Sequence, residues 1–294
     1  MIRGDTHARV SAALARRSDA ELQAAISAAT PLGVGIGGTV AAFAIDGAQV
    51  FVKTVRLTDL ERAVRSTANL FELPLHYQYG LSSAGFGAWR ELAAHELATQ
   101  WVLSGACESF PLLHHWRVLP RSPAASPDLE RQVAAWGGSS QIRARLAAME
   151  KASASIVLFL ERLPQDLKGF LDRAGAVPDW VDTQLLTVTT FLRERQFVHF
   201  DAHFGNILTD GRQLYLSDFG QALSATFTLT PAETAFLETH RDFDRSTVAM
   251  KLFAANQNPR YAEPAAVMNA FLARLKAGDW TAPFPRAELA QAWA

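Results

Sequence analysis

The sequence contains a single cysteine, Cys107, among 294 residues. One cysteine excludes a disulfide within the chain and a metal site built from several thiolates, and it is compatible with a reducing cytosol. Long apolar runs are missing too, since no stretch approaches the ~20 residues that a helix needs to span a bilayer. The first residues, MIRGDTHARV, show no hydrophobic signal core. We therefore expect a cytoplasmic protein with no membrane partner.

An excess of charge of either sign is also absent, because the net charge is −1. Proteins that bind nucleic acid usually carry a basic surface that neutralises phosphates, so we expect no nucleic-acid partner. The apolar fraction of 49% is typical of a globular protein. A chain of 294 residues is long enough for two lobes, each with its own core.

Polar side chains concentrate around one predicted hairpin. Two β-prone runs, Asn206–Leu208 and Gln213–Ser217, flank the turn Thr209-Asp210-Gly211. Asp-Gly between such runs is a strong short-range hairpin signal. Asp201 and Asn206 stand at one open end of this hairpin and Asp218 at the other. We therefore expect these three side chains to lie close together.

The same stretch allows a second interpretation. His199, Asp201 and His203 form the pattern H-x-D-x-H, and these residue types can bind Zn²⁺. Side chains two residues apart point the same way only on a strand, and no other histidine cluster lies near them. A metallohydrolase site is thus kept as an alternative.

A glycine motif lies near the start of the chain. Gly33, Gly35 and Gly38 form G-x-G-x-x-G, which is weak by itself because glycine-rich turns are common. A dinucleotide-binding fingerprint requires a helix after the motif. In this chain the motif is succeeded by two β-prone runs, Val40–Ile45 and Gln49–Lys53, joined by Asp46-Gly47. This order favours a loop between antiparallel strands that covers phosphate groups, with Val40 packed against the nucleotide base.

Lys53 ends the second of these runs and needs a carboxylate partner if it is to bind phosphate. The predicted helix Ala88–Ser104 offers two candidates. The periodicity of its apolar residues places Glu96 in the middle of the buried face and Glu91 roughly opposite. A buried carboxylate requires a cation, so we predict a Lys53–Glu96 pair and keep Glu91 as the alternative.

An apolar run, Ile156–Leu160, is followed by Glu161-Arg162-Leu163 and a predicted helix. This pattern resembles the hinge between the two lobes of protein kinases, and the resemblance implies that main-chain groups of Glu161 and Leu163 bind the edge of the adenine. An ordinary strand-to-helix turn is the alternative.

The remaining segments complete the predicted organisation. Residues 1–30 form a helical segment, in which Ser18 and Glu21 are a capping box. Residues 31–160 form a first lobe with insertions at 56–88 and 120–155, and residues 161–294 form a helix-rich second lobe.

Taken in order, these motifs resemble the protein-kinase-like superfamily, and most of all its aminoglycoside and choline phosphotransferase branch. The resemblance covers roughly residues 31–260 and implies an α+β, bilobal fold with an antiparallel-sheet N-lobe and an α-rich C-lobe. It implies ATP and Mg²⁺ as cofactors, with Lys53 on the α- and β-phosphates. Asp201 would orient or deprotonate the acceptor hydroxyl, and Asn206 and Asp218 would ligate Mg²⁺.

The chain departs from this pattern at several points. The catalytic loop reads His199-Phe200-Asp201, without the arginine of protein kinases and with phenylalanine where antibiotic phosphotransferases have glycine. No A-P-E triplet follows Asp218-Phe219-Gly220. The triplet His240-Arg241-Asp242 comes after that motif, so we interpret it as a helix end, with Asp242 or Asp244 supporting the catalytic loop.

The expected activity is transfer of the γ-phosphate of Mg·ATP to a hydroxyl. The acceptor is either an antibiotic- or metabolite-like small molecule or a peptide Ser/Thr. The alternative is a nucleotide-binding pseudokinase that acts as a regulatory interaction module.

Overall fold

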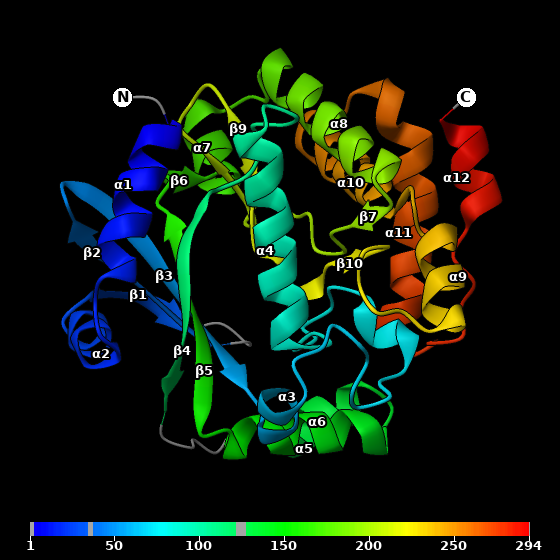
Figure 1. Cartoon of the computed structure of the whole chain (residues 1–294). Helices are drawn as coiled ribbons and strands as arrows, with labels where there is room; N and C mark the ends of the chain where they lie inside the picture. The colour runs from blue at the N-terminus through cyan, green and yellow to red at the C-terminus, as the bar shows by residue number, and fades with distance from the viewer. Residues whose placement is uncertain (1–2, 35–37, 122–127, 294) are drawn as a thin grey trace.

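The computed structural model describes residues 3–34, 38–121 and 128–293. It has an α+β architecture built on a five-stranded antiparallel sheet of order β1-β2-β3-β5-β4, with helices on both faces (Figure 1). The strands are β1 (Thr30–Val34), β2 (Gly38–Ile45), β3 (Ala48–Leu57), β4 (Leu113–Pro120) and β5 (Ala154–Glu161). The predicted α+β class is confirmed.

The hairpin β2–β3 forms where the sequence predicts it. Asp46 and Gly47 take left-handed φ values of 47° and 74°, as a two-residue hairpin turn requires. The register pairs Val40 with Lys53, so these two residues lie opposite each other on adjacent strands.

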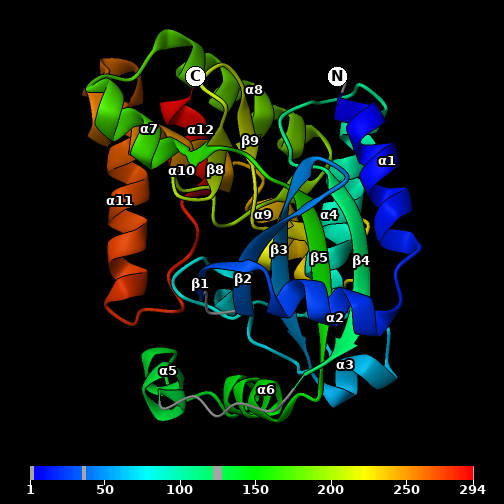
Figure 2. The same ribbon diagram turned by 90° about the vertical axis from the view of Figure 1, so that its left-hand side faces the viewer.

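Two helices cover one face of the sheet. They are α1 (Arg3–Ala15) and α2 (Asp19–Ser27), and the predicted capping box of Ser18 and Glu21 starts α2. Val10 and Leu14 of α1 pack against Val157 and Phe159 of β5. Figure 2 shows both helices on this side of the sheet.

The other face of the sheet packs against α4 (Ala88–Leu103). Ile156 and Leu158 of β5 contact this side, in alternation with the residues that face α1. Ala94 and Ala98 of α4 belong to the core of the helical part of the molecule. In Figure 1, α4 accordingly lies between the sheet and the later helices.

The helical part surrounds the predicted second hairpin. Its strands β8 (Ile207–Thr209) and β9 (Leu214–Leu216) pair antiparallel, which confirms the hairpin. β6 (Gln165–Asp166) pairs with β8, and β7 (Phe197–Val198) pairs with β10 (Leu223–Ser224). The surrounding helices are α7 (Leu167–Ala174), α8 (Asp179–Glu194), α9 (Pro231–Thr239), α10 (Phe243–Asn256), α11 (Ala262–Lys276) and α12 (Arg286–Ala292), and the short 3-10 helices there are η2 (Phe219–Gln221) and η3 (Pro259–Tyr261).

The two predicted insertions pack against each other. The first contains α3 (Asp59–Ala63) and the 3-10 helix η1 (Leu75–Gln78), and the second contains α5 (Leu129–Ala135) and α6 (Ser140–Lys151). Residues of both form one apolar cluster. A buried ion pair, Arg145 Nη1 to Glu61 Oε2 at 2.7 Å, joins them. Figures 1 and 2 show this unit at one end of the molecule.

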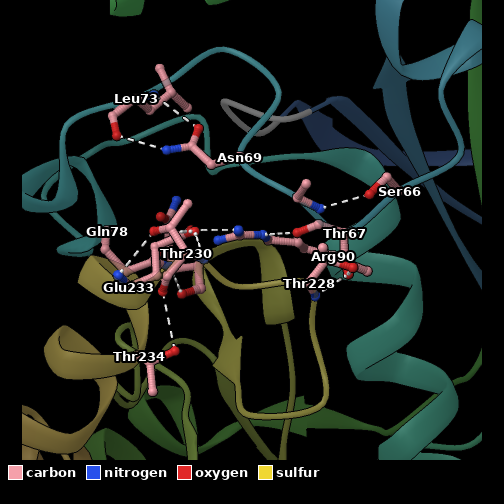
Figure 3. Close-up of polar contacts among 12 residues, drawn as sticks. Ser66, Thr67, Asn69, Leu73, Gln78, Arg90, Thr228, Thr230, Glu233 and Thr234 are labelled. Carbon is pink, nitrogen blue, oxygen red and sulfur yellow. Dashed lines mark hydrogen bonds and ion pairs between the residues drawn. The ribbon is translucent and has the colours of Figure 1, made fainter.

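A second buried ion pair fixes α4 to the start of α9 (Figure 3). Arg90 Nη2 lies 2.6 Å from Glu233 Oε1, and the two side chains are 3% and 1% exposed. Arg90 Nε donates to the Thr67 carbonyl at 2.6 Å, and Glu233 completes a capping box with Thr230. Three segments distant in the sequence therefore meet at one guanidinium group.

None of the helices in the described ranges combines the length and the apolar character that a bilayer crossing requires.

Candidate functional site

The predicted phosphate-binding lysine meets two carboxylates. Lys53 Nζ lies 2.7 Å from Asp218 Oδ1 and 2.7 Å from Glu91 Oε1. Burial by itself lowers the pKa of Lys53, but Asp218 and Glu91 outweigh it and raise the pKa above its ordinary value. Lys53 therefore stays protonated throughout the physiological range.

The two carboxylates differ in environment. Burial raises the pKa of Glu91, and the attraction of Lys53 only partly opposes it. At Asp218 burial acts in the same sense, but the Lys53 ammonium dominates and holds the pKa well below its usual range. Asp218 therefore remains ionised, and its side chain, at 46% exposure, is accessible.

The predicted Lys53–Glu96 pair is wrong, and the alternative partner, Glu91, makes the contact. Glu96 is exposed and accepts a hydrogen bond from Trp116 Nε1 at 3.0 Å. The helix forms as predicted, but the predicted assignment of its buried face is wrong. The reason is that α4 is covered on more than one side. Gln100 and Leu103, which the periodicity places on the buried face, are exposed.

A cavity of about 550 Å³ opens between the sheet and the helical part. The predicted residues that line it are Val40, Lys53, Glu161, Leu163, Asn206 and Asp218. Leu32, Phe51 and Leu160 add apolar wall around these polar groups. A volume of this size accommodates a ligand of cofactor dimensions. We refer to this space as the first cavity.

The glycine motif is only partly within the described residues. Gly33 lies in β1 and Gly38 begins β2, whereas Gly35 lies outside the described residues. Val40, the predicted contact for the base, does line the first cavity.

The segment after β5 places Glu161 and Leu163 on the cavity wall. The Glu161 N–H donates to the Leu112 carbonyl at 2.8 Å, so it is already engaged. The Glu161 carboxylate binds Arg3 of α1 through two hydrogen bonds, of 3.0 Å and 2.6 Å. No sequence pattern indicated this clamp, which ties the N-terminal helix to the predicted hinge.

The predicted catalytic loop is held by a network of buried polar groups. Asp244 Oδ2 accepts from the His199 N–H at 2.6 Å, and Asp244 Oδ1 accepts from the Phe200 N–H at 3.0 Å. Burial raises the pKa of Asp244 to about 7 despite these two bonds. Of the two predicted supports, Asp244 is the one that makes this contact with the loop.

Phe200, at the position where the sequence resemblance expects glycine, takes a left-handed φ of 63°. A bulky residue in this region is strained, and such strain persists only where the surroundings enforce it. The Phe200 ring is buried in the helical core, and its N–H is bound by Asp244. These contacts hold the backbone turn that glycine would adopt without strain.

Asp201 is bound from one side by Asn206. Asn206 Nδ2 donates to Asp201 Oδ2 at 2.9 Å and to the Asp201 carbonyl at 3.0 Å. Burial raises the pKa of Asp201 to about 7, repulsion by Asp218 adds to the shift, and the Asn206 bond opposes it. A carboxyl group with this pKa can accept a proton near neutral pH.

A glycine that the motifs did not identify packs directly on Asp201. A Cβ placed on Gly80 would lie 2.5 Å from Asp201 Oδ1 and 2.8 Å from the Phe200 carbonyl oxygen. Gln78 Nε2 donates to the Gln221 carbonyl, and Gln221 Nε2 donates to the Ser83 carbonyl at 2.8 Å. The first insertion therefore forms a wall against both the predicted catalytic loop and the segment after Asp218.

His95 of α4 also lines the first cavity, and the motifs gave no indication of it. Its ring packs edge-on against Phe219 with 4.8 Å between ring centroids. Burial lowers its pKa to about 3, so the ring is neutral. Neither ring nitrogen has a hydrogen-bond partner in the described part of the chain.

The residues present fit a hard divalent cation. Asn206 and Asp218 both reach the first cavity, and amide and carboxylate oxygens are ligands that Mg²⁺ accepts. Mg²⁺ usually keeps several waters and uses one or two carboxylates together with substrate phosphates. Two protein ligands beside a nucleotide-sized space agree with that pattern.

The zinc alternative does not fit the geometry. His199 Nε2 lies 2.9 Å from the Ser217 carbonyl oxygen, and Nδ1 accepts from the Asp201 N–H at 3.2 Å. Both ring nitrogens are thus engaged, and burial lowers the pKa of His199 to about 4. His199 links the predicted catalytic loop to the strand end before Asp218 and has no free nitrogen for a metal.

No protein-family model matches this chain, and no curated protein matches it either.

Proposed function

We propose that this protein is an ATP-dependent phosphotransferase with a bilobal, protein-kinase-like fold. The observation that carries the proposal is the Lys53 ammonium at 2.7 Å from both Glu91 and Asp218. These residues come from β3, α4 and the end of the second hairpin, and they meet at a cavity that Asn206 also lines. A structural lysine would need only one of these carboxylates.

In this proposal each residue has one role. Lys53 binds the α- and β-phosphates of ATP, and Glu91 holds Lys53 in place. Asn206 and Asp218 would hold Mg²⁺, which would supply positive charge opposite the phosphates. Asp201 accepts the hydroxyl proton as the acceptor oxygen bonds to the γ-phosphorus and the bond to the bridging oxygen of ADP breaks. Catalysis is therefore mainly positioning and electrostatics.

The test separates nucleotide binding from transfer. We expect Asp218→Asn to weaken Mg·ATP binding, measured by calorimetry, because it removes a ligand of the cation. We expect Asp201→Asn to bind Mg·ATP normally and to lose turnover of ATP to ADP and transfer to protein or hydroxyl acceptors. Asp172→Asn, at an exposed ion pair on α7, is the matched control.

Undiminished turnover in Asp201→Asn or Asp218→Asn would contradict the proposal. Tight Mg·ATP binding by the unaltered chain without any turnover or transfer would instead favour the pseudokinase.

A further inference from the structure

A second cavity, of about 470 Å³, lies beside Asp201. Its walls come from the catalytic loop, from residues 79–81 of the first insertion, and from α10 and α11. Asp201 lines this cavity, whereas Asn206, which binds Asp201, lines the first cavity. Each cavity therefore adjoins one member of the same hydrogen-bonded pair.

Charge in the second cavity is distributed unevenly. Asp201 is its single acidic lining residue among those described, while Lys251 of α10 and Lys276 of α11 are both cationic. Neither ammonium group has a hydrogen-bond or ion-pair partner in the described part of the chain. His203 also lines the cavity, but burial, with a contribution from Lys251, lowers its pKa.

A buried hydroxyl supplies a second, independent indication of a ligand. Thr247 lines the cavity and is 8% exposed. Its Oγ1 is buried and lacks a hydrogen-bond partner in the described ranges. An unpaired buried polar group destabilises the fold, so it usually points to an absent partner. Leu81, Met250 and Leu272 give the rest of the wall an apolar surface.

We propose that the second cavity binds the acceptor, and that this acceptor is a small hydroxyl compound with an apolar body and a carboxylate or phosphate group. The inference rests on the proposed phosphotransferase activity. The hydroxyl of the acceptor lies at Asp201. The apolar body lies against Leu81, Met250 and Leu272. Lys251 and Lys276 bind the anionic group. Polycationic acceptors are excluded by the same two lysines.

The transfer step balances without another reactant. The acceptor hydroxyl oxygen forms a bond to the γ-phosphorus of ATP, and the bond from that phosphorus to the bridging oxygen breaks. The hydroxyl proton moves to Asp201, and ADP leaves as the second product. The small volume of the cavity and its position between α10 and α11 favour a compact acceptor over a peptide chain.

The experiment uses four probes that share a hydroxymethyl-phenyl body and differ in the group at the para position. These groups are carboxylate, phosphate monoester, neutral amide and aminomethyl, which is cationic. Binding to the full chain is measured by ligand-observed NMR at constant ionic strength. We expect an anionic probe to bind at least about tenfold more tightly than the amide and the cationic probe to bind least. The two anionic arms distinguish a carboxylate site from a phosphate site.

Two variants connect the preference to the lysines. Lys251→Gln and Lys276→Gln should each weaken binding of the preferred anion by about tenfold and leave the amide probe within about twofold. Lys276 is exposed, so its replacement provides a variant that folds even if Lys251→Gln does not. Lys151→Gln, an exposed lysine at the end of α6, should change nothing.

Equal binding of all four probes, stronger binding of the cationic probe, or no binding of either anion at millimolar concentration would overturn the inference. Mg·ATP binding by the unaltered chain is measured separately. Its absence would reject the phosphotransferase, whereas the preference among the probes tests the cavity by itself.

Discussion

The amide of Asn206 donates two hydrogen bonds to Asp201, one to Oδ2 at 2.9 Å and one to the main-chain oxygen at 3.0 Å. Asn206 belongs to the wall of the first cavity and Asp201 to the wall of the second. A phosphoryl group that moves from one cavity to the other would pass this pair. This hydrogen-bonded pair therefore connects the walls of the two cavities.

The two glutamates of α4 provide a direct test of the ion-pair assignment. Glu91→Gln removes a charge in contact with Lys53, so the ammonium loses one of its two anchors. We expect ATP turnover to fall by about 10²-fold, as small misplacements of a catalytic group do. Glu96→Gln, on the exposed side of the same helix, should retain turnover. The reverse result would favour the Lys53–Glu96 pair.

The titration of Asp201 should be visible near neutral pH. Burial, with repulsion by Asp218, raises its pKa to about 7. The carboxyl group is therefore mostly protonated below this pH, and activity that uses it as a base should rise as pH increases through 7. Carbon-13 NMR of the ligand-free protein can follow the carboxyl signal, assigned by its loss in Asp201→Asn.

The variant Asp218→Asn tests the direction in which the Asp218 charge shifts the pKa of Asp201. Removing the Asp218 charge removes a repulsion, so the pKa of Asp201 should fall. A midpoint that stays unchanged or rises would show that the two carboxylates do not interact as the geometry requires.

Gly80 should be intolerant of any side chain. The Cβ of Gly80→Ala would lie 2.8 Å from the Phe200 carbonyl oxygen, so main chain must move and Asp201 with it. We expect turnover to fall by about 10²-fold with little change in the circular dichroism spectrum. Gly4→Ala, where a Cβ would meet nothing within 4 Å, is the control. Normal turnover in Gly80→Ala would mean that the contact has no functional role.

The Arg90–Glu233 pair should be a major determinant of stability. Arg90→Met leaves the Glu233 carboxylate buried without its cation, and we expect a loss of about 3–5 kcal/mol in the free energy of unfolding. Urea denaturation measures this loss. Arg131→Met breaks a pair whose arginine side chain is 79% exposed and should cost at most about 1 kcal/mol. Similar losses in both variants would contradict the argument from burial.

Local chemistry allowed much of the fold to be predicted from sequence. Asp46-Gly47 and Thr209-Asp210-Gly211 predicted two hairpins, and both formed. The predicted capping box of Ser18 and Glu21 starts α2. Turns and caps depend on a few neighbouring residues, so they can be predicted without knowledge of the rest of the chain.

The sequence by itself determined the order and spacing of Lys53, Asp201, Asn206 and Asp218 and the hairpins that carry them. Only the tertiary structure decided which face of α4 turns toward Lys53, because the neighbours of both candidate glutamates on the helix pack against other elements. It also decided the contact of Gly80 with Asp201 and the position of Lys251 and Lys276 around one cavity. Such contacts join residues far apart in the chain, and no local pattern encodes them.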